Sequence, residues 1–172
     1  MSCNFGGKEM NQLLKTLGAL VVVASFAAGH EVIAQENSSK YNCQSFGSGV
    51  PEALGDGLLI STDQYTCHVV SGPLSGGVMT GTTMWKWNGP EAVLVSGNGI
   101  ARKDGAAWVF VQTEGKIVVT MVGGKATGFG ASGTDRIVAA SGGAASLSGK
   151  ITTWTVSPNG PRQFTVDETM NQ

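Results

Sequence analysis

The sequence predicts an all-β protein folded as an antiparallel up-and-down β-barrel of about eight strands. Between residues 91 and 130, short apolar runs are separated at near-regular intervals by the pairs Asn98-Gly99, Asp104-Gly105, Glu114-Gly115 and Gly123-Gly124. Such pairs reach positive φ at little cost, as two-residue hairpin turns require. Several of the runs also alternate apolar and polar residues, which is typical of a half-buried strand. No convincing helix follows residue 34.

The succession of hairpins favours a closed barrel over a two-sheet β-sandwich, which is the other way to hide the edges of the sheet. An outer-membrane barrel is a third option. It needs outward apolar bands and strands of about 9–11 residues. Because the predicted strands mostly fall short of that length and their outward bands are weak, this option is the least favoured of the three.

Length and charge limit the partners. The chain has 172 residues, a formal net charge of -1 and only 13% charged residues. Nucleic-acid binding needs a clustered excess of Lys and Arg. The one adjacent basic pair, Arg102-Lys103, is followed at once by Asp104. We therefore expect one folded domain that binds no nucleic acid.

Residues 1–34 have the layout of a signal peptide. Lys15 precedes an apolar run at residues 17–28, which is shorter than the roughly 20 residues of a membrane-spanning helix and is followed by small residues. Cleavage after Ala34 fits this layout, and Met10 would give a more basic start than the first methionine. An uncleaved anchor is the alternative. Since no second apolar segment approaches spanning length, we expect an exported protein, periplasmic or secreted, without a stable membrane span.

The mature chain is expected to begin with an irregular lead-in at residues 35–56. This segment is polar at its start and contains Gly and Pro later, with at most a short strand near residues 44–46. The barrel domain then spans residues 57–172. Its first strands are expected at residues 57–61 and 64–71.

Two strands with marked patterns follow. Residues 77–87 form a strand in which Trp85 and Trp87 point the same way. An Asn-Gly-Pro turn leads to residues 92–101. This strand carries glycines at period two, which suggests a bend or a close approach by another backbone.

The second half of the domain continues the meander. Residues 106–113 place Trp108 and Phe110 on one face. Residues 117–122 are β-branched and apolar on both faces, which is typical of a central strand. The remaining strands are expected at residues 125–130, 135–140, 150–157 and 163–167.

The predicted mature chain has two cysteines, Cys43 and Cys67. Export takes the chain to an oxidising compartment, so we expect them to form a disulfide. The bond would stabilise the fold by roughly 3 kcal/mol, mainly by restricting the unfolded chain. It would tie the lead-in to the first well-formed strand.

Few residues could carry catalysis or bind a metal. His68 is the one histidine of the predicted mature chain, and neither metal-ligand spacing nor a GxSxG nucleophile elbow occurs. We therefore expect no metal and no cofactor. Asp63 and Glu52 could form an acid–base pair at a cavity mouth if burial separated their pKa values. The alternative is that both are solvated loop carboxylates.

Aromatic side chains on the strands are the best binding candidates. They either pack as a core or line a cavity, because a barrel of about eight strands can hold one small ligand. The candidate binding residues are His68, Tyr65, Trp85, Trp87, Trp108 and Phe110.

The pattern from residue 80 to residue 154 resembles the small bacterial, calycin-like barrels of the allene oxide cyclase and dirigent-like group. The resemblance is carried by residues 95–99 (VSGNG), 103–105 (KDG), 127–130 (TGFG) and 141–143 (SGG), and runs through to Trp154. It implies an eight-stranded antiparallel barrel with an apolar cavity. Such cavities steer ring closure or radical coupling, or bind small hydrophobic molecules, and the barrels often self-associate. No catalytic residue of the group matches a position in this chain.

These features predict an exported, disulfide-bridged barrel that binds a small apolar molecule or a protein partner. One alternative is a cavity enzyme of cyclase, isomerase or dirigent type, for which His68 or Asp63 would have to point into an apolar pocket. Another is a structural or surface protein that assembles through its barrel wall. Each of the three is compatible with a homo-oligomer.

Overall fold

The computed structural model describes residues 37–46 and 50–171. One short 3-10 helix, η1 (Ala145–Leu147), interrupts the strands of this part of the chain. The predicted signal peptide, residues 1–34, and the alternative start at Met10 lie outside the described residues. The described part contains no helix with the length and apolarity needed to cross a membrane.

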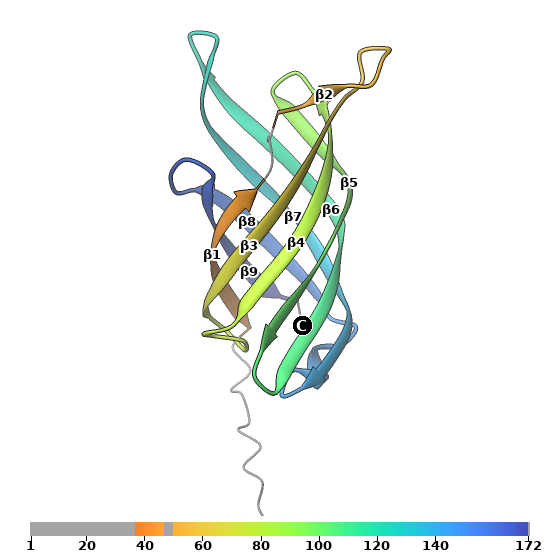
Figure 1. Ribbon diagram of the computed structural model, residues 1–172, viewed down its shortest axis with the longest axis vertical. Coiled ribbons are helices and arrows are strands. Elements are labelled where there is room, and N and C mark those ends of the chain that lie inside the picture. The colour runs from red at the N-terminus through yellow and green to blue at the C-terminus, as the bar shows by residue number, and fades with distance from the viewer. Residues whose placement is uncertain (1–36, 47–49, 172) are drawn as a thin grey trace, which may run out of the picture. The chain divides into compact units, whose positions relative to one another are not determined.

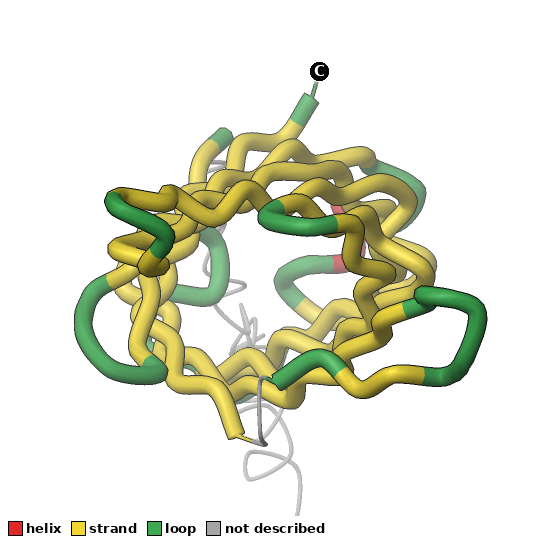
Figure 2. Tube along the Cα trace, turned by 90° about the horizontal axis from the view of Figure 1, so that it is seen from above, coloured by secondary structure: helices red, strands yellow, loops and turns green. Residues whose placement is uncertain are grey.

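Eight antiparallel strands close into a barrel, as the sequence predicted (Figure 1; Figure 2). The strands are β1 (Ser38–Phe46), β3 (Leu59–Ser71), β4 (Val78–Asn88), β5 (Glu91–Lys103), β6 (Ala106–Val122), β7 (Lys125–Gly142), β8 (Ile151–Pro158) and β9 (Gln163–Met170). From β3 to β9 each strand pairs with the next in the chain, and β1 completes the ring by pairing with both β9 and β3. An extra strand, β2 (Glu52–Ala53), pairs with the start of β3. The closed ring hides the edges of its strands, so the two-sheet alternative is wrong.

Glycine forms several of the predicted hairpin turns. The β4–β5, β5–β6 and β6–β7 connections consist of Gly89-Pro90, Asp104-Gly105 and Gly123-Gly124. The glycines in them have φ values from 58° to 77°. Residues with a Cβ rarely adopt these angles, so glycine allows each turn to be short.

Two other pairs that the sequence predicted as turns lie inside strands. Asn98-Gly99 continues β5 and Glu114-Gly115 continues β6. The register between β6 and β7 shifts at Gln112/Glu114, where a bulge absorbs the break in alternation without ending the strand. Several pairs of predicted strands are single long strands: β3 joins 57–61 to 64–71, β6 joins 106–113 to 117–122, and β7 joins 125–130 to 135–140.

The lead-in predicted at residues 35–56 is also wrong over residues 38–46, which form β1. Tyr41 and Cys43 point into the barrel and are buried, whereas Lys40 and Asn42 lie exposed on the outer face. The segment is polar overall because its outer face is polar, and this hid the alternation. The lead-in thus supplies the strand that closes the ring.

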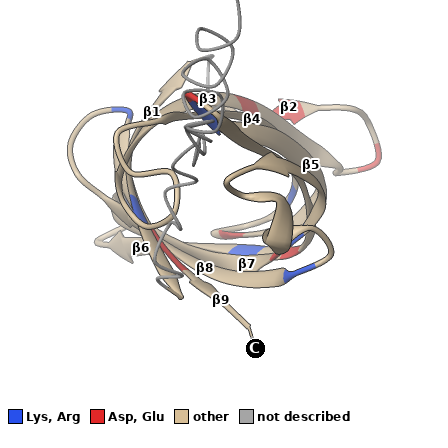
Figure 3. Cartoon of the chain, turned by 90° about the horizontal axis from the view of Figure 1, so that it is seen from below, with Lys and Arg blue, Asp and Glu red and all other residues tan. Residues whose placement is uncertain are grey.

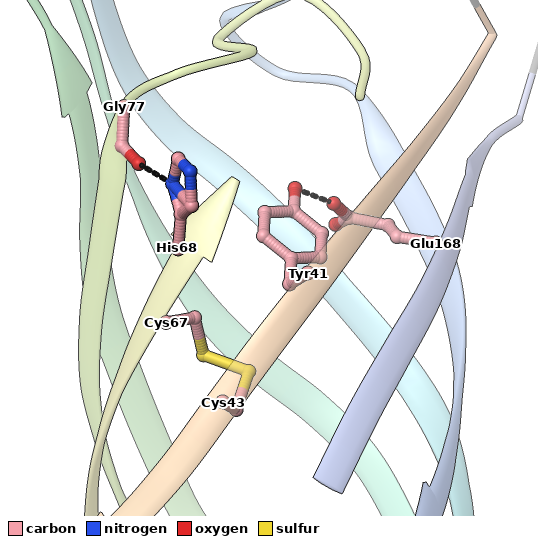
Figure 4. The surroundings of a disulfide bond; sticks show 6 residues. All are labelled: Tyr41, Cys43, Cys67, His68, Gly77 and Glu168. Atoms are coloured by element: carbon pink, nitrogen blue, oxygen red, sulfur yellow. Dashed lines mark hydrogen bonds between the residues drawn. A yellow bond between two sulfur atoms is a disulfide. The ribbon is translucent and has the colours of Figure 1, made fainter. Parts of the chain in front are cut away.

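The predicted disulfide is present and joins Cys43 of β1 to Cys67 of β3 (Figure 4). The two residues are directly opposite in register, with their Cα atoms 3.9 Å apart. Both side chains are buried. The bond therefore fastens together two of the strands that meet where the ring closes.

Apolar side chains fill one end of the barrel, which we call the closed end. It is formed by the β3–β4, β5–β6 and β7–β8 connections and faces the viewer in Figure 3, which also shows how few charged residues the barrel carries. Leu74 of the β3–β4 loop and Leu147 of η1 are buried here, as are Trp108 of β6 and Ile137 of β7. We call the opposite end, with the β4–β5, β6–β7 and β8–β9 turns, the open end.

Candidate ligand cavity

A cavity of about 460 Å³ lies inside the barrel, between the packed closed end and the open end. Small-molecule sites typically measure about 300–1,000 Å³. Every strand of the ring except β5 contributes to its lining, which is mainly aromatic and aliphatic. The aromatic lining residues are Tyr41, Tyr65, Trp85, Trp87, Phe110, Phe129, Trp154 and Phe164.

Hydrogen bonds within the protein hold the indole rings of the lining. Trp85 Nε1 donates to Thr83 Oγ1 at 2.8 Å, and Trp87 Nε1 donates to Ser61 Oγ at 2.8 Å. Buried indole N–H groups need such a partner. Because protein oxygens supply it, each ring is held in place and offers its apolar surface to the cavity.

Glycines make room for aromatic rings on the neighbouring strand. Gly81 is paired in register with Tyr65, and a Cβ added to Gly81 would lie 2.5 Å from the Tyr65 hydroxyl oxygen. Gly99 is likewise opposite Phe110, and its Cβ would lie 2.4 Å from the ring. The sequence suggested that the period-two glycines of β5 allow a bend or the close approach of a backbone. Both the Phe110 ring and a neighbouring backbone approach Gly99 closely, since its Cβ would also lie 2.5 Å from the backbone oxygen of Thr80.

Glu168 of β9 is a buried carboxyl group in the lining, only 8% exposed. The Tyr41 hydroxyl donates to its Oε2 (Figure 4), and Thr152 Oγ1 donates to its Oε1 at 2.6 Å. Burial raises the pKa of Glu168, while these two hydrogen bonds act in the opposite direction. Protein donors therefore occupy both of its oxygens.

Asp135 of β7 is the second buried carboxyl group of the lining, 6% exposed. Trp154 Nε1 donates to its Oδ1 at 2.6 Å. Burial, and next the charge of Glu168, raise the pKa of Asp135 to about 8, although the indole hydrogen bond lowers it. At neutral pH the Asp135 carboxyl is therefore mostly protonated.

The two carboxyl groups are held through β8, the strand between them. Thr152 is opposite Asp135 in register but donates to Glu168, whereas Trp154 is opposite Glu168 but donates to Asp135. This crossed pattern places both carboxyl groups against the same short stretch of β8. It explains why Asp135 responds to the charge of Glu168.

The lining contains no Lys, Arg or His. In the described chain, ion pairs join Lys40 to Asp167 at 3.5 Å and Lys116 to Glu91 at 3.0 Å, and all four side chains are about half exposed to solvent. A buried carboxylate without a cation is costly. Buried acidic groups with perturbed pKa values are common at functional sites.

The structure brings together four of the six candidate binding residues from the sequence. The four that line the cavity are Tyr65, Trp85, Trp87 and Phe110. His68 lies instead on the exposed outer face of β3, with its Nδ1 3.2 Å from the Gly77 carbonyl oxygen (Figure 4), because it alternates with the inward Cys67. Trp108 is buried in the packed core and is not part of the lining.

The two carboxylates that the sequence suggested as an acid–base pair have different surroundings. Asp63 lines the cavity, and partial burial raises its pKa. Glu52 is exposed on β2. In the described residues, no group of three or more His, Cys, Asp or Glu side chains could hold a metal ion.

Sequence reasoning missed Tyr41, Asp135 and Glu168. A signal for Glu168 was present, because residues 164–170 alternate and place it on the same face as Phe164, Val166 and Met170. A lone carboxyl group on an otherwise apolar strand face is a signal for a buried acid at a functional site.

Comparisons with known proteins assign no family to the chain: no family model matches it, and no curated protein or solved structure does either. Function is therefore inferred from the cavity and its residues.

Proposed function

We propose that this protein binds a small, mainly apolar molecule inside its barrel. The observation that carries the proposal is the cavity of about 460 Å³ with aromatic walls and an end packed shut behind it. Barrels of about eight strands either fill their interior with side chains or hold one small ligand. A cavity of this size supports the second arrangement.

The N-terminal pattern and the disulfide support a role outside the cytoplasm. The signal-like residues 1–34 suggest export, and the Cys43–Cys67 bond suits an oxidising compartment. The proposed binder would therefore work in the periplasm or after secretion. The resemblance to allene oxide cyclase and dirigent-like barrels supports the binding of a small apolar molecule, since it implies an apolar cavity.

The test uses the neutral fluorescent probe N-phenyl-1-naphthylamine, which brightens when it enters an apolar site. We expect saturable binding by the oxidised protein. Ala131 of β7 lines the cavity, whereas its neighbour Gly130 does not and points to the outer face. Ala131→Trp should therefore weaken probe binding by at least about tenfold by filling the site, a loss of about 1.4 kcal/mol.

Gly130→Trp is the matched control and should bind the probe like the wild type. Equal binding by both variants would mean that the probe sits elsewhere on the protein. No saturable binding by the wild type would remove the proposal.

A cavity enzyme of cyclase, isomerase or dirigent type is the second candidate, favoured by Asp135. Its carboxyl group lines the cavity and has a pKa of about 8, so it could give or take a proton near neutral pH. Incubating a small-molecule extract of the producing cells with the protein separates the two functions. New product masses made by the wild type but not by Asp135→Asn would favour the enzyme, whereas unchanged molecules that co-purify would favour the binder.

A further inference from the structure

Of the four oxygens of the two buried carboxyl groups in the cavity, one has no protein donor in the part of the chain that the structure describes. Both oxygens of Glu168 accept protein hydroxyl groups, and Asp135 Oδ1 accepts the Trp154 indole. In the described chain, no group donates to Asp135 Oδ2. Among the described residues, the fully buried side-chain oxygens without a partner are Ser39 Oγ and Gln112 Oε1. Asp135 Oδ2 has no partner and is not fully buried, so it is accessible from the cavity that Asp135 lines.

We propose that the molecule bound in the cavity is an organic cation, an ammonium group on an apolar body. In this arrangement the ammonium group lies against Asp135 Oδ2 and the apolar body packs on the aromatic lining. This inference rests on the proposed binding function and adds the chemical class of the ligand.

Two features of the lining favour a cation over other small molecules. Asp135 and Glu168 are acidic, and no Lys, Arg or His of the lining balances them. The electron-rich faces of Trp85, Trp87 and Trp154 attract cations as well, most strongly where water is excluded. Once ionised, the same carboxyl groups would repel a fatty acid or another organic anion.

Binding of a cation should be linked to proton release. The ionisable groups of the lining are Asp135 on β7, Glu168 on β9, Tyr41 on β1, and Asp63 and Tyr65 on β3. Asp135 holds a proton at neutral pH in the empty cavity, since its pKa is about 8. A permanent cation beside it would favour the ionised carboxylate and expel that proton.

The test compares two molecules of the same shape that differ by one charge, phenyltrimethylammonium and tert-butylbenzene. Each is measured by displacement of N-phenyl-1-naphthylamine from the oxidised full-length protein. We expect the cation to bind at least about tenfold more tightly than its neutral counterpart. Its affinity should also rise between about pH 6 and about pH 9, because phenyltrimethylammonium does not titrate and Asp135 does.

Asp135→Asn keeps an oxygen that can accept the Trp154 indole but removes the charge. It should lose the preference for the cation and the rise with pH, while tert-butylbenzene binds as before. Asp167→Asn is the matched control, since Asp167 is next to Glu168 in β9 but lies exposed on the outer face. This variant should behave like the wild type.

The outcomes separate this inference from the proposed function. If tert-butylbenzene binds as tightly as the cation, or if Asp135→Asn keeps the preference, the cation inference is overturned and the binding function stands. The cation inference also fails, and the binding function stands, if the fluorescent probe binds but neither molecule displaces it. If the fluorescent probe itself does not bind to the protein, both proposals fail.

Discussion

Trp154 lies across Gly133, the residue directly opposite it on β7. A Cβ added to Gly133 would lie 2.4 Å from Cζ2 of the indole and 2.2 Å from the backbone oxygen of Glu114. The φ angle of Gly133 is not positive, so lack of space rather than backbone conformation requires glycine here. The same Trp154 ring donates to Asp135. The missing side chain at Gly133 thus helps to place a hydrogen-bond donor of the cavity.

Gly133→Ala should therefore destabilise the protein. The indole could shift, but the backbone oxygen of Glu114 belongs to the neighbouring strand and cannot move without disturbing the ladder. We expect a loss of about 1–3 kcal/mol, as for other overpacked sites, measured by urea unfolding. Gly130→Ala is the control on the same strand, and its Cβ meets nothing within 4 Å. It should change stability by no more than about 0.5 kcal/mol. Equal effects of the two substitutions would show that crowding is not the cause.

The disulfide should contribute strongly to stability. Cys43 and Cys67 are separated by 24 residues and connect two strands that meet where the ring closes. Replacing both by Ala should lower the free energy of unfolding by about 3 kcal/mol, mainly because the unfolded chain gains freedom. A reducing agent should lower the urea midpoint of the wild type and leave that of the double variant unchanged. A wild-type midpoint that does not respond to reduction would contradict this account.

The barrel could be predicted from the sequence because local signals repeat along it. Asp104-Gly105 and Gly123-Gly124 fix hairpin turns by their own backbone preferences, and alternation in β3 places Tyr65 and Cys67 on one face of the strand, which the structure buries. These features depend on neighbours in the chain. They survive in the structure as predicted.

Other features depend on contacts that no local pattern contains. The Glu114-Gly115 pair has the sequence of a turn. In the structure β7 pairs with β6 at both of these residues and on either side of them, which keeps β6 extended. The burial of Glu168 depends on Tyr41, which is 127 residues away in the chain and reaches it only because β1 closes the ring beside β9. A cavity site of this kind is assembled by closure, so sequence reasoning found part of its aromatic wall and missed its two buried carboxyl groups, Asp135 and Glu168.

Stability should fall as pH rises, because of Asp135. Its pKa is about 8 in the folded protein, against 3.8 for the ordinary carboxyl group. Between these two values the folded state keeps a proton that the unfolded state has lost, so the free energy of unfolding decreases with pH by up to about 1.4 kcal/mol per unit. The contribution is fully present below about pH 4 and is lost as pH passes about 8. Glu168, whose pKa burial also raises, adds to the same trend.

Asp135→Asn tests this pH dependence, because the amide cannot titrate. Urea unfolding of this variant between about pH 5 and about pH 9 should give a shallower decline than in the wild type, with the remainder due to Glu168 and Asp63, whose pKa values burial also raises. Asp167→Asn, at an exposed carboxylate that pairs with Lys40 on the surface, should leave the wild-type slope in place. If the wild-type and Asp135→Asn curves ran parallel, Asp135 would not be the buried acid that holds the proton. Its place as the anionic partner of a bound cation would then have to pass to Glu168, whose two oxygens are already occupied by Tyr41 and Thr152.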